Sequence, residues 1–123
     1  MAGIMTHNSI LIRQGDSFDI VMQFKNKNGT PIDISESKIL LTVQDKDKIL
    51  KFKIIGEIID GVNGKARIKI LPKHSEQEAG IYAANIEIIF KNGDVHTIFP
   101  QDLTSNAIFQ ISEEVSDDGN KYF

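Results

Sequence analysis

The sequence predicts a single all-β domain built as a sandwich of strands. Apolar and polar residues alternate with a period of two over long stretches, as in Phe18–Phe24 and Lys65–Ile70. Clusters of turn-forming residues separate these stretches at short intervals, and no long helical pattern alternates with them. The chain has 123 residues, of which 41% are apolar and 25% are charged, as expected for one globular domain.

The expected strands follow from this alternation and from the turns that bound it. In chain order they are Ser9–Arg13, Phe18–Lys25, Lys38–Gln44, Ile49–Ile59, Lys65–Ile70, Ile81–Phe90, Val95–Phe99 and Ala107–Ile111. Gly56 predicts a bulge or a bend inside the long fourth strand. One short helical turn is expected near residues 72–78, with Pro72 at its start and Gly80 beyond its end. The pair Asn92-Gly93 predicts a hairpin closed by a type I′ turn.

These elements divide the chain into a lead-in over residues 1–8, a sandwich over 9–112, and an acidic tail over 113–123 without fixed structure. Tyr82 makes the sandwich more specific, because it follows a tight crossing, Glu78-Ala79-Gly80, just inside a strand. Immunoglobulin-like sandwiches place a tyrosine there and turn its hydroxyl back to the backbone. Ala84 stands where many such domains have a cysteine. We therefore expect an immunoglobulin-like sandwich of about seven to nine antiparallel strands without the inter-sheet disulfide.

Composition argues against several classes of partner. The chain has no cysteine, and its formal net charge is −3. Its lysines between Lys46 and Lys53 are interleaved with Asp45 and Asp47, which indicates a solvated hairpin rather than a track for phosphates. No stretch resembles a signal peptide or is long enough to cross a bilayer. We expect neither a nucleic-acid partner nor a membrane partner.

No pattern predicts catalysis or a bound cofactor. The histidines, His7, His74 and His96, lie in separate segments, and His74 with Glu76 or Glu78 does not match a zinc spacing. Asp45-Lys46-Asp47 lacks the glycine and glutamate of a calcium loop, and Asn28-Gly29-Thr30 is better explained as a turn than as a glycosylation site. The acidic side chains that a hydrolase would need are Asp16, Asp19, Asp33 and Asp102, whose spacing does not bring them together. We expect no catalytic residue, no metal and no cofactor.

Paired isoleucines suggest a covered surface beyond the core. Ile54-Ile55, Ile58-Ile59 and Ile88-Ile89 place apolar side chains on both faces of their strands. Only one face of a sandwich strand points to the core, so subunit contact or edge pairing would cover the other. The alternative is ordinary burial at the ends of strands.

The order of motifs resembles one protein family. Ile12–Phe18 with Gly15-Asp16 comes first, then Gly29-Thr30-Pro31, Asn63-Gly64, Gly80-Ile81-Tyr82 and the Asn92-Gly93 hairpin. This order resembles the N-terminal immunoglobulin-like domain of phage baseplate upper proteins, found in siphophages and prophages of Gram-positive bacteria, over about residues 9–112.

The resemblance implies an assembly part of the virion tail that docks onto the central baseplate hub, with other tail proteins and copies of itself as partners. It implies structural rather than catalytic roles for Gly15, Asp16, Gly29, Pro31, Gly80, Tyr82, Asn92 and Gly93. Such proteins continue into further segments, which these 123 residues do not contain. The alternatives are an immunoglobulin-like module that binds carbohydrate or a cell surface, which exposed aromatic side chains would indicate, and an enzyme, which a pocket with convergent carboxylates or histidines would indicate.

Overall fold

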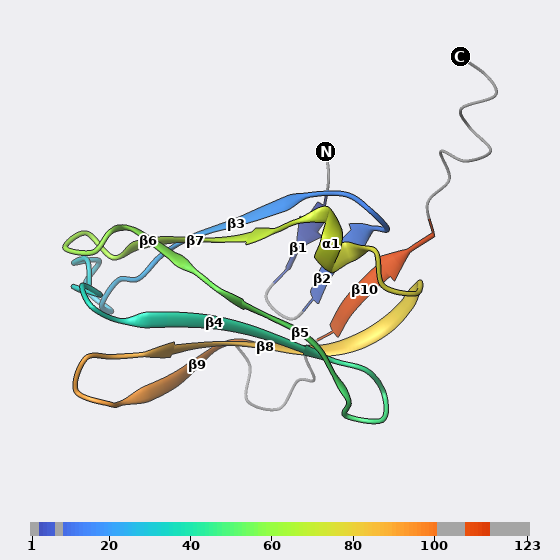
Figure 1. The fold of residues 1–123 in the computed structure, drawn as a ribbon. Helices are drawn as coiled ribbons and strands as arrows, with labels where there is room; N and C mark the ends of the chain where they lie inside the picture. The colour runs from blue at the N-terminus through green and yellow to red at the C-terminus, as the bar shows by residue number, and fades with distance from the viewer. Residues whose placement is uncertain (1–2, 7–8, 101–107, 114–123) are drawn as a thin grey trace, which may run out of the picture.

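The protein is a sandwich of two β-sheets packed face to face (Figure 1). The computed structural model describes residues 3–6, 9–100 and 108–113. The larger sheet contains β1 (Gly3–Met5), β2 (Ser9–Arg13), β4 (Lys38–Gln44), β5 (Leu50–Ile55), β8 (Gly80–Ile89), β9 (Val95–Phe99) and β10 (Ile108–Ser112). The smaller sheet contains β3 (Phe18–Gln23), β6 (Glu57–Asp60) and β7 (Lys65–Ile70). The all-β sandwich predicted from the sequence is confirmed.

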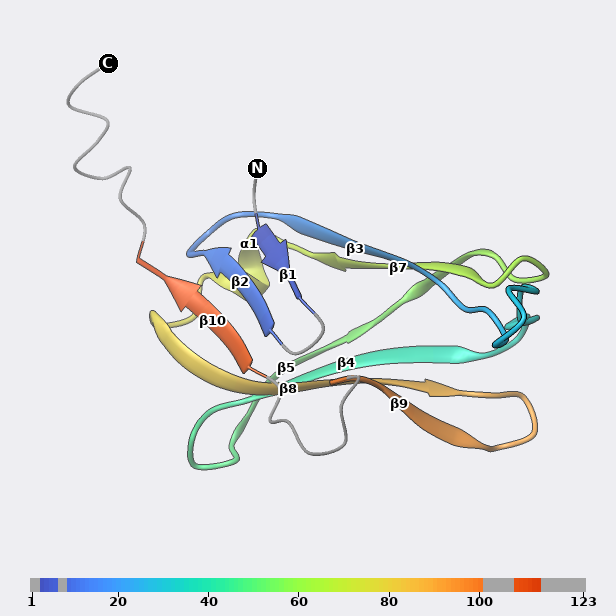
Figure 2. The same cartoon turned by 180° about the vertical axis from the view of Figure 1, so that it is seen from behind.

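The long strand β8 organises the larger sheet, whose order is β1-β2-β10-β8-β4-β5. On one side β8 pairs with β4 through residues 83–89. On the other side it pairs first with β10, through residues 80–83, and then with β9, through residues 86–89. β10 also pairs with β2, and this contact is parallel, whereas the sequence led us to expect antiparallel strands. Figure 2 shows β1, β2 and β10 standing together at one end of the molecule.

The order of strands is that of an immunoglobulin-like domain. The smaller sheet has the order β3-β7-β6, which corresponds to strands B, E and D of that fold. β4, β8 and the pair β9 and β10 correspond to strands C, F and G, and β5 extends this sheet beyond β4. Strand A would lie beside B, but β1 and β2 belong to the larger sheet. No described strand therefore occupies the position beside β3.

The expected strand Ile49–Ile59 is two strands in two different sheets, so the expectation of one continuous strand was wrong. β5 pairs with β4, and β6 pairs with β7 after the chain passes from one layer to the other at Gly56 (Figure 1). The Gly56 N–H donates to the Ile39 carbonyl at 2.7 Å. A Cβ atom on Gly56 would lie 3.1 Å from the Ile39 Cβ. The expected bend is present. Because Gly56 has no side chain, the chain can cross close to β4 at this point.

The hairpin at Asn92-Gly93 exists, but its type I′ turn does not. Gly93 has a φ of 95°, whereas Asn92 is not among the described residues with positive φ. A type I′ turn needs positive φ at both central residues. The Gly93 N–H instead donates to the Phe90 carbonyl, and the Phe90 N–H to the Asp94 carbonyl. This is a type I turn followed by a left-handed glycine, which closes a hairpin with a bulge.

Two further elements differ from expectation. The helix α1 spans only Pro72–Ser75, shorter than the helical turn expected near 72–78. Within the expected lead-in, β1 pairs antiparallel with β2, from Gly3 opposite Ile12 to Met5 opposite Ile10. Of the expected acidic tail only Glu113 lies among the described residues.

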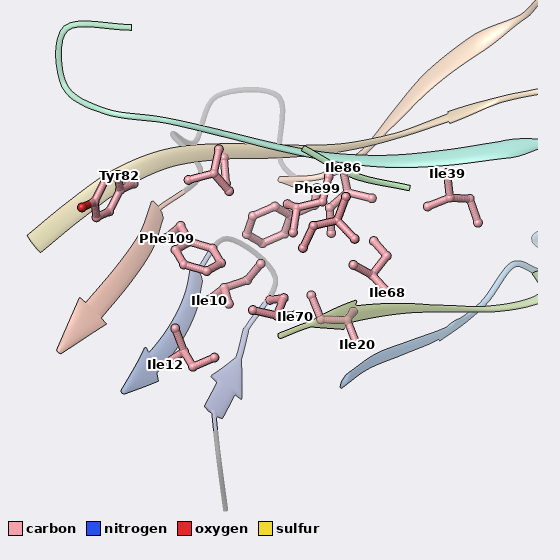
Figure 3. Close-up of a cluster of buried hydrophobic side chains, with 14 of the residues drawn as sticks. Ile10, Ile12, Ile20, Ile39, Ile68, Ile70, Tyr82, Ile86, Phe99 and Phe109 are labelled. Atoms are coloured by element: carbon pink, nitrogen blue, oxygen red, sulfur yellow. The ribbon is translucent and has the colours of Figure 1, made fainter. Parts of the chain in front are cut away.

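The core lies between the sheets and is formed almost entirely of aliphatic side chains (Figure 3). Inward positions alternate along the strands, so that β4 buries Ile39, Leu41 and Val43 while its other residues are half-buried or exposed. Phe99 and Phe109 add the largest fully buried side chains. Burial of this apolar surface is the main force that holds the two sheets together.

Candidate interaction surface

The side chains that could take part in chemistry lie in separate places. The His74 ring packs against Phe52 with centroids 5.2 Å apart, and its Nδ1 accepts a hydrogen bond from the Leu71 N–H at 2.9 Å. Burial lowers the pKa of His74 below its usual 6.5. His96 contacts Phe90 edge to face on another element. No three His, Asp or Glu side chains gather as a metal site in residues 3–6, 9–100 and 108–113, which do not include His7.

The candidate carboxylates stabilise turns instead of meeting in a cleft. Asp45 Oδ1 accepts hydrogen bonds from the Ile49 and Asp47 N–H groups, and the Ile49 bond contributes most to lowering the pKa of Asp45. Hydrogen bonding by Ser35 likewise lowers the pKa of Asp33. Asp16 lies in the β2–β3 turn, and Asp102 lies outside the described residues. Asp33 and Asp45 thus hold the backbone of exposed loops, whereas Asp19 lies exposed on β3.

The Gly15-Asp16 turn rests on the short helix. Gly15 has a φ of 84°, which glycine adopts without strain, and the Asp16 N–H donates to the Arg13 carbonyl. The hydroxyl of Ser75, in α1, donates to the Asp16 carbonyl at 2.6 Å, and Ser75 is fully buried. Ser75 is not among the residues predicted from the sequence, because a lone serine in a helical turn does not indicate its tertiary partner.

Tyr82 makes the hydrogen bond that the sequence predicts. It is 8% exposed at the start of β8, and its hydroxyl donates to the Glu78 carbonyl. Burial raises the pKa of Tyr82. Gly80, two residues earlier, opens the strand in an exposed position. This corner fixes the path of the chain between the end of α1 and β8.

The remaining motif residues occupy hairpin ends. Gly29 is left-handed, with a φ of 88°, and Pro31 forms an isolated antiparallel bridge with Lys25. Asn92 Oδ1 accepts a hydrogen bond from the Asp94 N–H at 2.9 Å, next to the left-handed Gly93. The eight residues to which the motif order assigns structural roles thus lie at turns, corners or hairpin ends.

An apolar groove opens along one side of the sandwich, between β3 and β9. Two hollows of about 580 and 480 Å³ share Gln23, Phe24 and Ile98 and so form one groove. Buried Ile86 and Ile88 of β8 are among its lining residues, together with the less buried Met22, Phe24 and Ile98. We call this the β3 groove. It lies where the smaller sheet lacks a strand beside β3, and Met5 and Thr6 at the end of β1 line part of it.

The outer edge of β3 offers hydrogen-bonding groups. The Phe24 N–H donates to the Gly64 carbonyl at 2.8 Å, on the side of β7. In a strand, the N–H and C=O groups of successive residues point to alternating sides. Those of Val21 and Gln23 therefore point away from β7, toward the edge that no described strand pairs with. Val21 is also 70% exposed on the outer face.

The opposite side of the sandwich presents exposed isoleucines. Of the three pairs singled out in the sequence, Ile55 is 65% and Ile59 is 50% exposed, whereas Ile54 is buried. Ile55 and Ile59 flank the crossing from β5 to β6, and Ile49 and Leu50 are exposed at the other end of β5. We call these four residues the crossover edge. The third pair is covered, because Ile88 is buried and Ile89 half-buried.

Aromatic side chains are not prominent on the described surface. Every phenylalanine and tyrosine among residues 3–6, 9–100 and 108–113 is buried or half-buried. Stacking on a sugar ring uses a broad exposed aromatic face. The described helix α1 has four residues, and no described helix is long and apolar enough to cross a membrane.

Comparison with known proteins assigns no family. No protein-family model matches the chain, and no curated protein matches it. Among solved structures, CopC from Methylosinus trichosporium OB3b is similar at 10% identity with a TM-score of 0.44, over 78% of this chain and 76% of that one.

Proposed function

We propose that this chain is a non-catalytic assembly module of a phage or prophage tail, acting in the baseplate of the virion through protein–protein contacts. The observation that carries the proposal is the placement of the motifs whose order resembles baseplate upper proteins. Gly15-Asp16, Gly29–Pro31 and Asn92-Gly93 end or join strands, and Tyr82 forms the corner before β8. The resemblance thus rests on residues that shape one immunoglobulin-like domain rather than on scattered matches.

The crossover edge is the first surface to test for docking onto the baseplate hub. Ile55 and Ile59 present large apolar side chains to solvent at the point where the two sheets join. Large exposed aliphatic side chains on a small domain are candidates for contact surfaces. A domain that docks through such residues needs no pocket and no catalytic group.

Co-expression with the tail proteins encoded beside its gene tests the proposal. We expect the chain to co-elute with the hub protein of the baseplate on size-exclusion chromatography, at a fixed ratio measured by light scattering. Ile55→Lys and Ile59→Lys should weaken this complex, because each places a charge against an apolar contact. Val95→Lys, an equally exposed position on β9, is the matched control.

The possible outcomes test the assembly role and the docking surface separately. Binding that survives both isoleucine variants would move the docking surface elsewhere on the domain. Failure of the parent chain to bind any neighbouring tail protein would contradict the assembly role itself.

A further inference from the structure

We propose that a second copy of this chain pairs its β3 with the free edge of β3, antiparallel and symmetric about Met22, to form a dimer. The two smaller sheets then join into one continuous sheet with three strands from each copy. The proposal rests on the edge and the groove, and it does not depend on the role in a phage tail.

The sequence of β3 is complementary to itself in this register. With Met22 opposite Met22, Val21 lies opposite Gln23, and the exposed Asp19 lies opposite the exposed Lys25 of the other copy. Oppositely charged residues directly across two antiparallel strands attract each other. The two-fold axis repeats this pair, so that each dimer contains it twice.

The hydrogen-bond pattern allows the same register. The backbone groups of Val21 and Gln23 point to the free edge, as argued above from the Phe24 to Gly64 bond. The odd-numbered residues of β3 therefore exchange hydrogen bonds with the other copy. In the proposed register Val21 lies opposite Gln23, so the two can form such a hydrogen-bonded pair. Met22 then forms a non-hydrogen-bonded pair, in which the Cα atoms are about 4.5 Å apart.

The β3 groove explains why the added strand is a second β3. A strand beside β3 turns alternate residues toward Ile86 and Ile88 at the base of the groove. The second copy supplies the half-buried Met22 and Phe24 on that face, which are apolar and correctly spaced, while its Ile20 stays buried in its own core. Its own groove is covered by the first copy in return.

The β3 edge also lacks the features that keep edge strands apart. From Phe18 to Phe24 there is no proline and no lysine, and Asp19 is the single charged residue. β5, at one end of the larger sheet, carries Lys51 and Lys53. The contrast points to pairing at β3 and against pairing at β5.

A cysteine cross-link tests the register directly, because the chain has no cysteine of its own. Under mild oxidation Met22→Cys should form a covalent dimer, since the proposed spacing fits a disulfide. Val21→Cys is the control: it is more exposed, but its counterpart is Gln23, so it should cross-link far less. Preferential cross-linking at position 21 would overturn the register, and equal, slow cross-linking at both would overturn the dimer.

Charge exchange tests the same contact without altering the apolar side chains of the groove. Asp19→Lys and Lys25→Asp should each raise the dimer dissociation constant about tenfold, because two attractive pairs become repulsive. The double variant Asp19→Lys/Lys25→Asp should restore dimerisation, and Asp47→Lys, in the β4–β5 turn, should leave it unchanged. Circular dichroism confirms that each variant is folded.

Light scattering over a range of concentrations completes the test. The parent should show the mass of two chains at high concentration. A parent that stays monomeric at every concentration, or a double variant no better than the single ones, would refute the proposal. Neither result depends on binding to a tail protein.

Discussion

At the scale of single residues, the side chain of Tyr82 has two structural roles. Its ring is buried at the edge of the core (Figure 3). Its hydroxyl donates a hydrogen bond to the carbonyl of Glu78. The ring anchors β8 to the sandwich, and the hydrogen bond fixes the preceding crossing. The pattern was readable because both features are local in sequence.

Replacement of Tyr82 by phenylalanine isolates the hydrogen bond. Tyr82→Phe keeps the ring and leaves the Glu78 carbonyl without its donor, so we expect a loss of about 1 kcal/mol in the free energy of unfolding. Urea denaturation followed by circular dichroism measures it, with an unchanged dependence on urea as the check that the ensemble is the same. An unchanged unfolding midpoint would remove the hydroxyl from the forces that hold the corner.

Other residues depend on contacts that sequence alone cannot reveal. Gly64 is left-handed, with a φ of 71°, and a Cβ atom there would lie 2.5 Å from the Phe24 carbonyl oxygen. Its place in a turn was predictable, but the neighbour that excludes a side chain is 40 positions away in the sequence. Ser75 was missed for the same reason, because its partner Asp16 belongs to a different turn.

At the scale of elements, one design closes three hairpin-like turns. In each, an N–H donates to a carbonyl three residues back, and the donating residue is left-handed: Gly29, Lys48 and Gly93. The three turns begin at Asn26, Asp45 and Phe90. The N–H group of each of these residues donates to the carbonyl four residues further along the chain. Glycine fits this position best, and Lys48 occupies it with a φ of 65°.

The lysine at this position should therefore cost stability. We expect Lys48→Gly to raise the free energy of unfolding by up to about 1 kcal/mol, because glycine adopts positive φ without the clash of a Cβ atom. Thermal or urea unfolding measures the change.

A neighbouring lysine provides the control. Lys46→Gly alters the same turn at a residue without positive φ, so it should lower stability by making the unfolded chain more flexible. Equal effects of the two variants would mean that the left-handed backbone at Lys48 is not strained.

Strands could be predicted from the sequence where residues alternate with a period of two. Their assignment to one sheet or the other could not. The strands Ser9–Arg13, Lys38–Gln44, Lys65–Ile70 and Val95–Phe99 were placed correctly. The division of Ile49–Ile59 was not, because its alternation continues across Gly56 while the chain changes sheet. β1 was missed because three residues are too few to show a period.

At the scale of the whole molecule, the fold class followed from the sequence, whereas the surfaces did not. The alternation of apolar and polar residues identifies the inward positions of a strand. It does not show which strand lies at the edge of its sheet. The alternation in Phe18–Phe24 predicts one face turned toward the core, and Ile20 on that face is buried there. Only the order β3-β7-β6 reveals that this strand is an edge with a groove beneath it.

The pH dependence of stability should carry the signature of His74. Burial lowers the pKa of His74 in the folded state below 6.5, and its Nδ1 accepts the Leu71 N–H. The unfolded chain then takes up the proton first, so stability falls as the pH drops through 6.5 toward the lower pKa of the folded state. His74→Asn keeps an acceptor that does not titrate, and we expect a flatter stability curve over that interval.

Aspartate carboxylates cause a separate loss of stability at lower pH, which His74→Asn should not change. Hydrogen bonds lower the pKa values of Asp33, Asp45 and Asp60 below 3.8, so their stabilisation is present above 3.8 and disappears as the pH falls through the folded values. Thermal unfolding in a series of buffers separates the two intervals. A parent and variant with parallel curves above pH 5 would contradict the role of His74.

The parallel pair of β2 and β10 governs how the domain would respond to a pulling force. Ser112 lies opposite Arg13, and Gly3 lies opposite Ile12, so the two described ends of the chain lie at the same end of β2. Tension between them first peels β1 from β2, one hydrogen bond at a time. It then acts along β2 and β10 in opposite directions, loading all of their hydrogen bonds together. The domain would thus yield a short length of chain easily and then resist further extension.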